Sequence, residues 1–244
     1  YENNKVTIPR VTKEHQPHLT TWSTKKAVEF IGRHKEEPFF VYVPHSMPHV
    51  PLFVSEKFAG KSGAGLLGDV LMEIDWSVGQ INQALKDNGL ENDTLLVFTS
   101  DNGPWVSYGN HAGATPFREA KGTSFDGGIR SACLAKYPGK LAAGSVSEAA
   151  WCTIDLLPTI AHLTETPLPK NTIDGKNVWP LITGAKDAKT PQPYYAFSNG
   201  RDFQGVISGD GKWKLHVPHT YRTLVKPAND GQAGKYRQST IENN

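Results

Sequence analysis

An acidic residue and an amide follow directly after an apolar segment in the middle of the chain. Residues 94–99 are rich in β-forming side chains and lead into Asp101-Asn102-Gly103-Pro104. A carboxylate beside an amide carbonyl offers two hard oxygen ligands, which suit calcium or magnesium better than zinc. An Asx-type turn that only ends a strand would explain the same residues. We predict that Asp101 and Asn102 are metal ligands.

A histidine in a proline-rich segment is a second candidate for chemistry. His49 stands in the sequence Pro48-His49-Val50-Pro51, where the two prolines reduce the entropy lost when the imidazole is held in place. As imidazolium, His49 could bind an anion or protonate the leaving oxygen of an ester. A loop histidine that only hydrogen-bonds the backbone looks the same in a sequence.

A glycine-rich segment supplies a third group of candidates, centred on a cation. Lys121-Gly122-Thr123 is followed by Asp126-Gly127-Gly128. The glycines let the backbone approach an anion, and lysine supplies a compact positive charge. A solvated turn explains this segment as well. His111 and Arg118 come from the preceding loop, and both are candidate pocket residues.

Alternating helices and strands are predicted to position these candidates. Apolar residues at spacings of three and four predict helices over residues 22–34, 66–85 and 152–163. Thr20 and Thr21 are the predicted caps of the first helix. Short runs of β-forming residues predict strands at residues 39–43, 94–99 and 130–137. Such alternation indicates an α/β fold with a mostly parallel sheet between helices, in which ligands bind beyond the carboxyl ends of the strands.

The pattern changes after about Pro191. Two short strand-like runs, residues 205–208 and 213–217, flank the turn Gly209-Asp210-Gly211 and predict an antiparallel hairpin. We therefore expect residues 1–190 to belong to a large α/β domain and residues 191–244 to begin a small C-terminal antiparallel α+β unit. Residues 226–244 are polar and lack an apolar period, so we predict a long loop or a frayed end there.

Composition narrows the class of protein. The chain of 244 residues has a formal net charge of +2 and no dense block of lysine and arginine, so nucleic acid is not an expected partner. It has no apolar run of about 18 residues, so we expect no membrane-spanning helix in the printed sequence. Cys133 and Cys152 lack the spacing of a zinc site or of a disulfide scaffold, and we predict that both are buried thiols.

The order of these segments resembles that of the sulfatase family, most closely the branch of arylsulfatase A and N-acetylgalactosamine-6-sulfatase. The resemblance is carried by Pro48-His49-Val50-Pro51 and by residues 98–104, 121–130, 153–159 and 209–215. It implies an alkaline phosphatase-like α/β fold and a sulfuric-ester hydrolase, with a sulfated carbohydrate or an aryl sulfate as substrate. It also implies a periplasmic or secreted location.

The resemblance assigns roles to individual residues. It implies that Asp101 and Asn102 bind an active-site calcium ion, with magnesium the less favoured metal. It further implies that His49 contacts the sulfate ester near its leaving oxygen and that Lys121 binds sulfate oxygens. These roles fit the chemistry, because a sulfate ester needs its oxygens neutralised by metal and cations while the leaving alkoxide is protonated.

The nucleophile of the family is a formylglycine hydrate, made from the first residue of a Cys-or-Ser, x, Pro, x, Arg motif. The printed sequence contains no such motif, and its nearest string, residues 114–118, begins with alanine. The paired aspartates that complete the family's metal site also have no counterpart. We therefore expect a fragment that needs an upstream part of the same protein and is inactive by itself.

Two other functions fit part of this pattern. A phosphoester or phosphonate hydrolase of the alkaline phosphatase superfamily would keep the fold, but it usually binds two transition metals through several aspartates and histidines. Asp101-Asn102 with Lys121 suits one hard cation and a sulfate instead. A non-catalytic carbohydrate-binding remnant would keep the fold and lose the chemistry, and its only support is the missing nucleophile motif.

Overall fold

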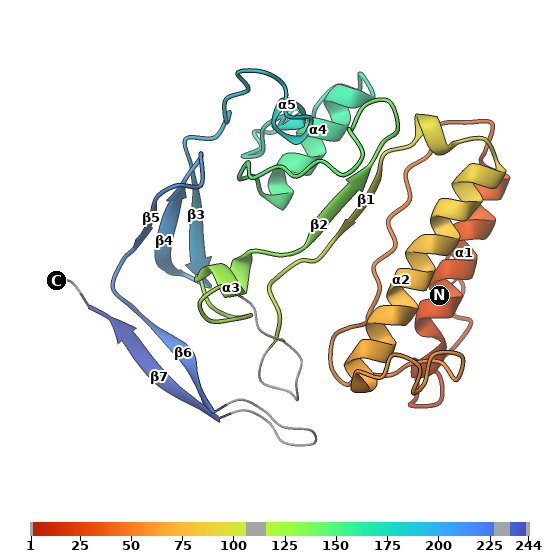
Figure 1. Cartoon of the computed structure of the whole chain (residues 1–244), viewed down its shortest axis with the longest axis horizontal. Coiled ribbons are helices and arrows are strands. Elements are labelled where there is room, and N and C mark those ends of the chain that lie inside the picture. Colours follow the sequence, from red (N-terminus) through yellow and green to blue (C-terminus); the bar gives the residue numbers. More distant parts are fainter. Residues whose placement is uncertain (1, 106–115, 227–234, 243–244) are drawn as a thin grey trace. The chain divides into compact units, whose positions relative to one another are not determined.

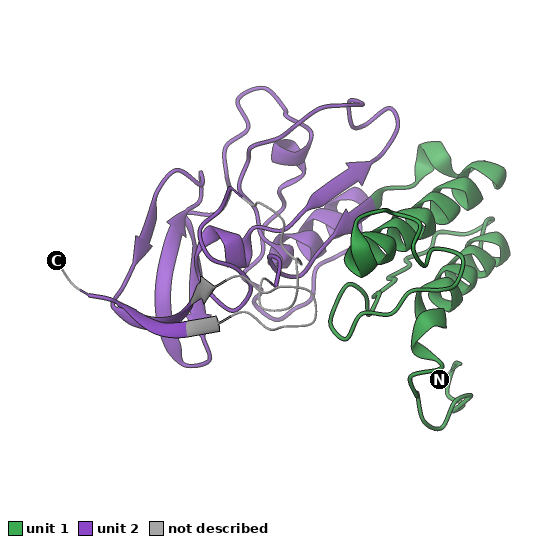
Figure 2. Ribbon diagram, turned by 60° about the horizontal axis from the view of Figure 1, so that its bottom comes forward, with its two compact units in different colours: residues 1–96 green, residues 97–244 purple. Residues whose placement is uncertain are grey.

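The chain forms two compact units, residues 1–96 and residues 97–244 (Figure 2). The structure is a computed structural model that describes residues 2–105, 116–226 and 235–242. The predicted domain boundary near Pro191 falls inside the second unit and stays a prediction.

Two long helices form the first unit and lie side by side (Figure 1). The helical elements of this unit are η1 (Gln16–His18), α1 (Leu19–Arg33), α2 (Gly65–Asp87) and η2 (Glu91–Asp93). Ile31 of α1 and Ala84 and Leu85 of α2 make the buried core between the helices. Apolar residues three and four apart put one stripe of each helix on this core, as the sequence predicts.

The first helix begins earlier than predicted. It starts at Leu19 rather than at residue 22, so Thr20 and Thr21 lie within its first turn and not before it. Thr20 is buried, and the Thr21 hydroxyl donates to the carbonyl oxygen of His18 at 2.9 Å. The two threonines therefore do not cap the helix.

The apolar run Phe39–Val43 is not a strand, in contrast to the prediction. Its residues alternate between partly buried and exposed positions, with Phe40 73% and Tyr42 77% exposed. The extended segment pairs with no strand among the described residues. A strand needs a neighbour that accepts and donates its backbone hydrogen bonds, and composition alone does not provide one.

A short sheet begins the second unit and delivers two of the candidate residues. Its two strands, β1 (Leu96–Thr99) and β2 (Cys133–Lys136), are shorter than the predicted runs. The apolar composition of residues 94–99 would suit a buried strand, but β1 alternates between half-buried and exposed residues. Cys133 is exposed and Cys152 is partly exposed, which corrects the prediction of two buried thiols. Residues 133–135 of β2 are all exposed, so this strand has no covered face that would bury a thiol.

Short helices follow in the second unit, and one of them carries a buried carboxylate. These elements are α3 (Asp126–Ile129), η3 (Thr153–Asp155), α4 (Leu156–Leu163) and α5 (Trp179–Ile182). Asp155 is fully buried and accepts hydrogen bonds from the backbone of Cys152 and Lys176 and from the side chains of Gln192 and Tyr195. Burial raises the pKa of the Tyr195 hydroxyl, and its hydrogen bond to Asp155 acts in the same direction.

Antiparallel strands end the chain (Figure 1). A three-stranded sheet contains β3 (Tyr194–Asn199), β4 (Asp202–Ser208) and β5 (Lys214–His216), and a separate pair contains β6 (His219–Lys226) and β7 (Lys235–Ile241). The hairpin of β4 and β5 confirms the prediction made from the turn Gly209-Asp210-Gly211. The prediction of a loop or frayed end after residue 226 is wrong for β7, which pairs with β6 along its length.

Candidate functional site

The two predicted metal ligands lie just beyond the end of β1. Asp101 is exposed and Asn102 is half-buried. The Asn102 side-chain amide donates to the carbonyl oxygen of Gly103 at 2.8 Å, which orients its own carbonyl oxygen as the available acceptor. The Ser100 hydroxyl donates to the backbone oxygen of Asn102 at 3.2 Å. The turn therefore carries a carboxylate and an amide oxygen on consecutive residues.

Backbone hydrogen bonds join this turn to the segment that carries Lys121. The backbone N–H of Gly103 donates to the oxygen of Gly128 at 2.9 Å, and the N–H of Lys121 donates to the oxygen of Pro104 at 3.0 Å. Within the segment that carries Lys121, the N–H of Gly127 donates to the backbone oxygen of Arg118 at 2.8 Å. The structure thus brings Asp101 and Asn102 onto the same backbone network as Lys121.

Three glycines make this close approach possible. A Cβ atom on Gly103 would lie 1.9 Å from the oxygen of Gly127, and one on Gly127 would lie 2.0 Å from the oxygen of Glu119. A Cβ on Gly128 would lie 2.2 Å from the oxygen of Thr123. The sequence alone suggested that glycines here let the backbone approach an anion. The structure shows that they let one backbone segment approach another.

The side chains of Lys121 and Arg118 have different surroundings. The Lys121 ammonium lies 5.2 Å from the centre of the Trp105 ring, within the range of a cation–π contact. The Arg118 guanidinium lies 4.2 Å from the centre of the Phe125 ring and donates to the Tyr221 hydroxyl at 2.9 Å. Arg118 thus contacts protein groups, and its role in substrate binding stays a prediction. His111 lies outside the described residues.

His49 belongs to the first unit, whereas Asp101, Asn102 and Lys121 belong to the second. The His49 side chain is exposed, and its Nδ1 lies 2.7 Å from the backbone oxygen of Val50. Because the carbonyl can only accept, Nδ1 is the nitrogen that carries the hydrogen in this contact. The joining of His49 with the other three residues into one site is part of the proposal below.

The side-chain oxygens of Asp101 and Asn102 are suitable for part of a calcium site. Calcium takes about six to eight oxygen ligands in proteins. Asp101 and Asn102 offer oxygen ligands of the right kind, since one is a carboxylate and the other an amide. In the described residues, no group of three or more His, Cys, Asp or Glu side chains could hold a metal ion.

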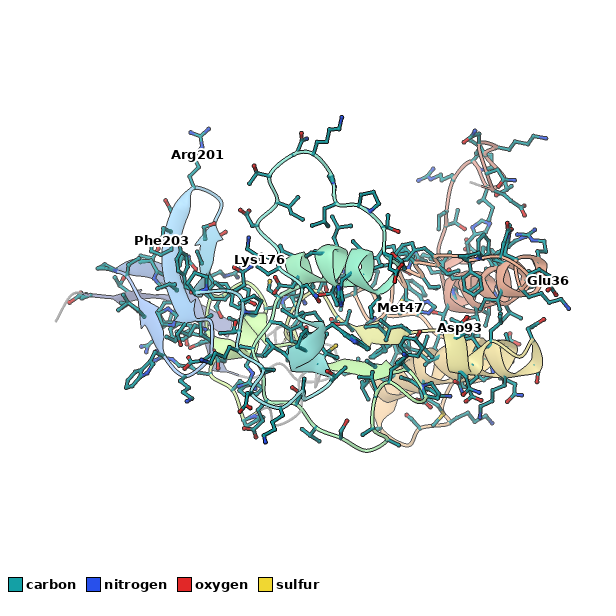
Figure 3. All side chains as sticks on the ribbon, turned by 90° about the horizontal axis from the view of Figure 1, so that it is seen from above. Glu36, Met47, Asp93, Lys176, Arg201 and Phe203 are labelled. Carbon is teal, nitrogen blue, oxygen red and sulfur yellow. The ribbon has the colours of Figure 1, made fainter. Side chains whose placement is uncertain are left out.

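Two surface hollows of the second unit are lined by residues that are not predicted site residues. One of about 380 Å³ is lined by residues of β4 and β6 and the turns beside them, among them Arg201, Phe203 and His219. Figure 3 shows that Arg201 points outward from the end of the β3–β4 turn. A second hollow of about 570 Å³ lies beside α4 and includes Lys176. Neither hollow contains a predicted site residue.

Sequence reasoning missed three polar side chains that contact the Lys121 segment. They come from β5 and β6 and are Lys214, Tyr221 and Thr223. Each bonds to a residue about 90 to 100 positions earlier in the chain, so no local pattern could reveal the contact. The match of residues 209–215 to a known family was the one signal that pointed to this region.

Comparison with known proteins identifies the family. Residues 2–166 match the family model described as Sulfatase. Arylsulfatase A of Bos taurus is 39% identical over 187 residues, which cover 76% of this chain and 37% of that protein. The chain belongs to the sulfatase family. N-acetylgalactosamine-6-O-sulfatase of Bacteroides thetaiotaomicron, another relative, is 34% identical over 223 residues, which cover 85% of this chain and 43% of the relative.

Solved structures confirm the fold class. A sulfatase from Pseudoalteromonas superimposes with a TM-score of 0.84 and 24% identity, over 98% of this chain and 48% of that structure. The fold is the alkaline phosphatase-like α/β fold expected from the sequence. The chain spans less than half the length of the curated relatives described above. In the part of the chain that the structure describes, no helix is long and apolar enough to cross a membrane.

Proposed function

We propose that this sulfatase chain forms part of a sulfuric-ester hydrolase that acts on a sulfated carbohydrate or an aryl sulfate. Family membership supports the reaction class. The relatives named above are an arylsulfatase and a sulfatase of N-acetylgalactosamine, which supports these two substrate classes. We also propose a periplasmic or secreted location, by analogy with the family.

One observation carries the proposal, namely the backbone network that joins the Asp101–Asn102 turn to the Lys121 segment. The backbone N–H of Gly103 donates to the oxygen of Gly128, and that of Lys121 donates to the oxygen of Pro104. These bonds join the segment with the two proposed oxygen ligands to the segment with the proposed cation. Calcium bound by the two oxygens would neutralise sulfate oxygens and polarise the ester. Lys121 would bind the remaining sulfate charge as a compact cation.

His49 supplies the proton in this proposal. Loss of an alkoxide from sulfur is favoured when a positioned acid protonates the leaving oxygen, and a histidine suits this task near neutral pH. The hydrogen on Nδ1 faces the Val50 carbonyl, so Nε2 is the nitrogen assigned to the leaving oxygen. Arg118 and His111 are proposed as further contacts of the substrate.

The nucleophile is proposed to come from another part of the protein. A formylglycine hydrate requires a Cys-or-Ser, x, Pro, x, Arg motif, which the printed sequence lacks. An upstream segment would supply this group together with the remaining calcium ligands. The 244-residue chain alone should therefore bind sulfate weakly and should not turn over a sulfate ester.

The test compares the complete protein with the 244-residue chain, using 4-nitrophenyl sulfate and a sulfated disaccharide as substrates. We expect turnover by the complete protein, loss of turnover after calcium removal with EGTA, and recovery with calcium. The 244-residue chain alone should show no turnover. Asp101→Ala in the complete protein should abolish recovery, because it removes the carboxylate ligand. Asp75→Ala, which removes an exposed carboxylate of α2, is the matched control.

Other outcomes would point to other functions. Faster turnover of 4-nitrophenyl phosphate with a requirement for zinc would replace the proposal with a phosphoester hydrolase. Binding of sulfated oligosaccharide without turnover, in a complete protein that lacks the nucleophile motif, would favour a carbohydrate-binding remnant. Turnover by the 244-residue chain alone would show that the upstream part is not needed.

A further inference from the structure

Residues 118–126, which carry Lys121, contact the protein on two sides. On one side, the backbone N–H of Lys121 donates to the oxygen of Pro104, next to the predicted calcium ligands. On the other, side chains that lie 88, 103 and 104 residues after their partners reach the segment. All of these contacts lie within the second unit.

The beginning of the segment is held by β6. The Arg118 guanidinium donates to the hydroxyl of Tyr221 at 2.9 Å, and the Thr223 hydroxyl donates to the carboxylate of Glu119 at 2.7 Å. Glu119 has a φ of +58°, a left-handed conformation that a residue with a side chain adopts only when its surroundings hold it. The Thr223 contact falls on this unusual residue, three residues after Pro116 and two before Lys121.

The end of the segment is held by β5. The Lys214 ammonium donates to the carboxylate of Asp126 at 2.8 Å, and the Lys214 side chain is only 17% exposed. Phe125, which is buried, stacks on the His216 ring with the ring centres 4.5 Å apart and also meets Tyr221 edge-on at 4.8 Å. Both ends of the segment are therefore fixed by charge-assisted bonds and aromatic packing.

We propose that Tyr221, Thr223 and Lys214 are positioning residues that fix the place of the Lys121 ammonium. The inference rests on the proposed role of Lys121 in sulfate binding and deepens it. Lysine has a long flexible side chain, so a fixed backbone is what limits the space that its ammonium can sample. The three residues contact the flanking positions 118, 119 and 126 rather than Lys121 itself.

The size of the effect follows from geometry. A displacement of about 1 Å in a positioned group can lower reactivity or binding by roughly 100-fold. Each substitution removes one of several contacts, so we expect the affinity for sulfate to fall on the order of 10-fold per variant, below that limit. Charge is not changed in two of the variants, Tyr221→Phe and Thr223→Val, so long-range attraction of the anion stays constant.

The experiment measures the dissociation constant of inorganic sulfate by calorimetry, on the calcium-loaded complete protein. Tyr221→Phe, Thr223→Val and Lys214→Met are each compared with matched controls in the same sheet region. Tyr194→Phe and Lys212→Met serve as controls because both side chains are exposed. We expect weaker sulfate binding in the first three variants and unchanged sulfate binding in the two controls. A melting curve for each protein identifies variants that unfold.

A double-mutant cycle with Lys121→Ala separates positioning from a general structural effect. If Tyr221 acts through Lys121, Tyr221→Phe should weaken sulfate binding in the unchanged protein and have no further effect in Lys121→Ala. Equal losses in both backgrounds would overturn the inference, as would unchanged affinity in all three single variants. If Lys121→Ala itself binds sulfate normally, the proposed role of Lys121 fails first, and this inference fails with it.

Discussion

His216 shows at the scale of one residue how packing changes a titratable group. Burial lowers its pKa, and the electrostatic effects of Lys214, His219 and Arg118 act in the same direction. The carboxylate of Asp126 acts in the opposite direction and does not outweigh them. The folded protein therefore holds the His216 ring neutral, stacked on Phe125.

This lowered pKa predicts a pH dependence of stability. An unfolded histidine has a pKa of about 6.5. As the pH falls through this value, the unfolded chain takes up a proton that folded His216 resists, so the free energy of unfolding decreases. The contribution of His216 is complete above pH of about 6.5 and is lost as the pH falls toward the lower folded pKa. Urea denaturation between pH 8 and pH 5 should show this decrease.

Substitution identifies the group responsible. His216→Phe keeps an aromatic ring against Phe125 but cannot bind a proton, so the decrease below pH of about 6.5 should become smaller. His18→Phe is the matched control, because His18 is exposed and stacks on Trp22. An unchanged pH profile in His216→Phe would assign the acid sensitivity to another residue.

At the scale of elements, the glycine contacts predict which substitutions disrupt the turn after β1. Gly103→Ala would place a methyl group 1.9 Å from the oxygen of Gly127, where neither backbone segment can move without breaking the hydrogen bond from Gly103 to Gly128. We expect the free energy of unfolding to fall by about 1 to 3 kcal/mol, the usual effect of overpacking. Chemical denaturation measures this free energy. The calcium affinity of the complete protein should fall in parallel.

An alanine elsewhere should have the opposite effect. Gly79 lies in the middle of α2, and a Cβ there would meet no atom within 4 Å. Gly79→Ala should therefore raise stability by about 0.5 to 1 kcal/mol, since glycine loses more backbone freedom than alanine on folding. Equal effects of Gly79→Ala and Gly103→Ala would contradict the steric explanation.

At the scale of the whole molecule, the 244-residue chain exposes large apolar side chains. Tyr42 of the unpaired extended segment is 77% exposed, and Trp213 beside β5 is 78% exposed. Among the described strands, β1 and β2 pair only with each other. Exposed apolar surface and unpaired strand edges favour association with other chains.

We therefore predict that the isolated chain self-associates. Sedimentation velocity should show a weight-average coefficient that rises with protein concentration. Replacing both Tyr42 and Trp213 with lysine should reduce this rise. The same charges added at two exposed polar residues, Asn171→Lys and Thr172→Lys, should leave it unchanged. A monodisperse monomer at all concentrations would argue against the expected dependence on an upstream segment.

Local patterns in the amino-acid sequence were sufficient to predict part of this structure. Spacings of three and four fixed the two long helices, and the Gly-Asp-Gly turn fixed the hairpin of β4 and β5. The order Asp101-Asn102-Gly103-Pro104 placed a carboxylate and an amide beyond a strand, as the structure has them. These features depend on neighbours in the chain, so residue type and period are sufficient to predict them.

Features that depend on residues far apart in the sequence could be seen only in the folded chain. The folded chain pairs β7 with β6, exposes Cys133 and places Tyr221 against Arg118. It also leaves residues 39–43 without a strand partner in the part of the chain that the structure describes. Burial and hydrogen bonding of a residue depend on what the rest of the chain brings to it, and β-propensity or side-chain polarity cannot supply that information. For the same reason, the sequence could name Lys121 as a candidate but could not show which residues hold its segment.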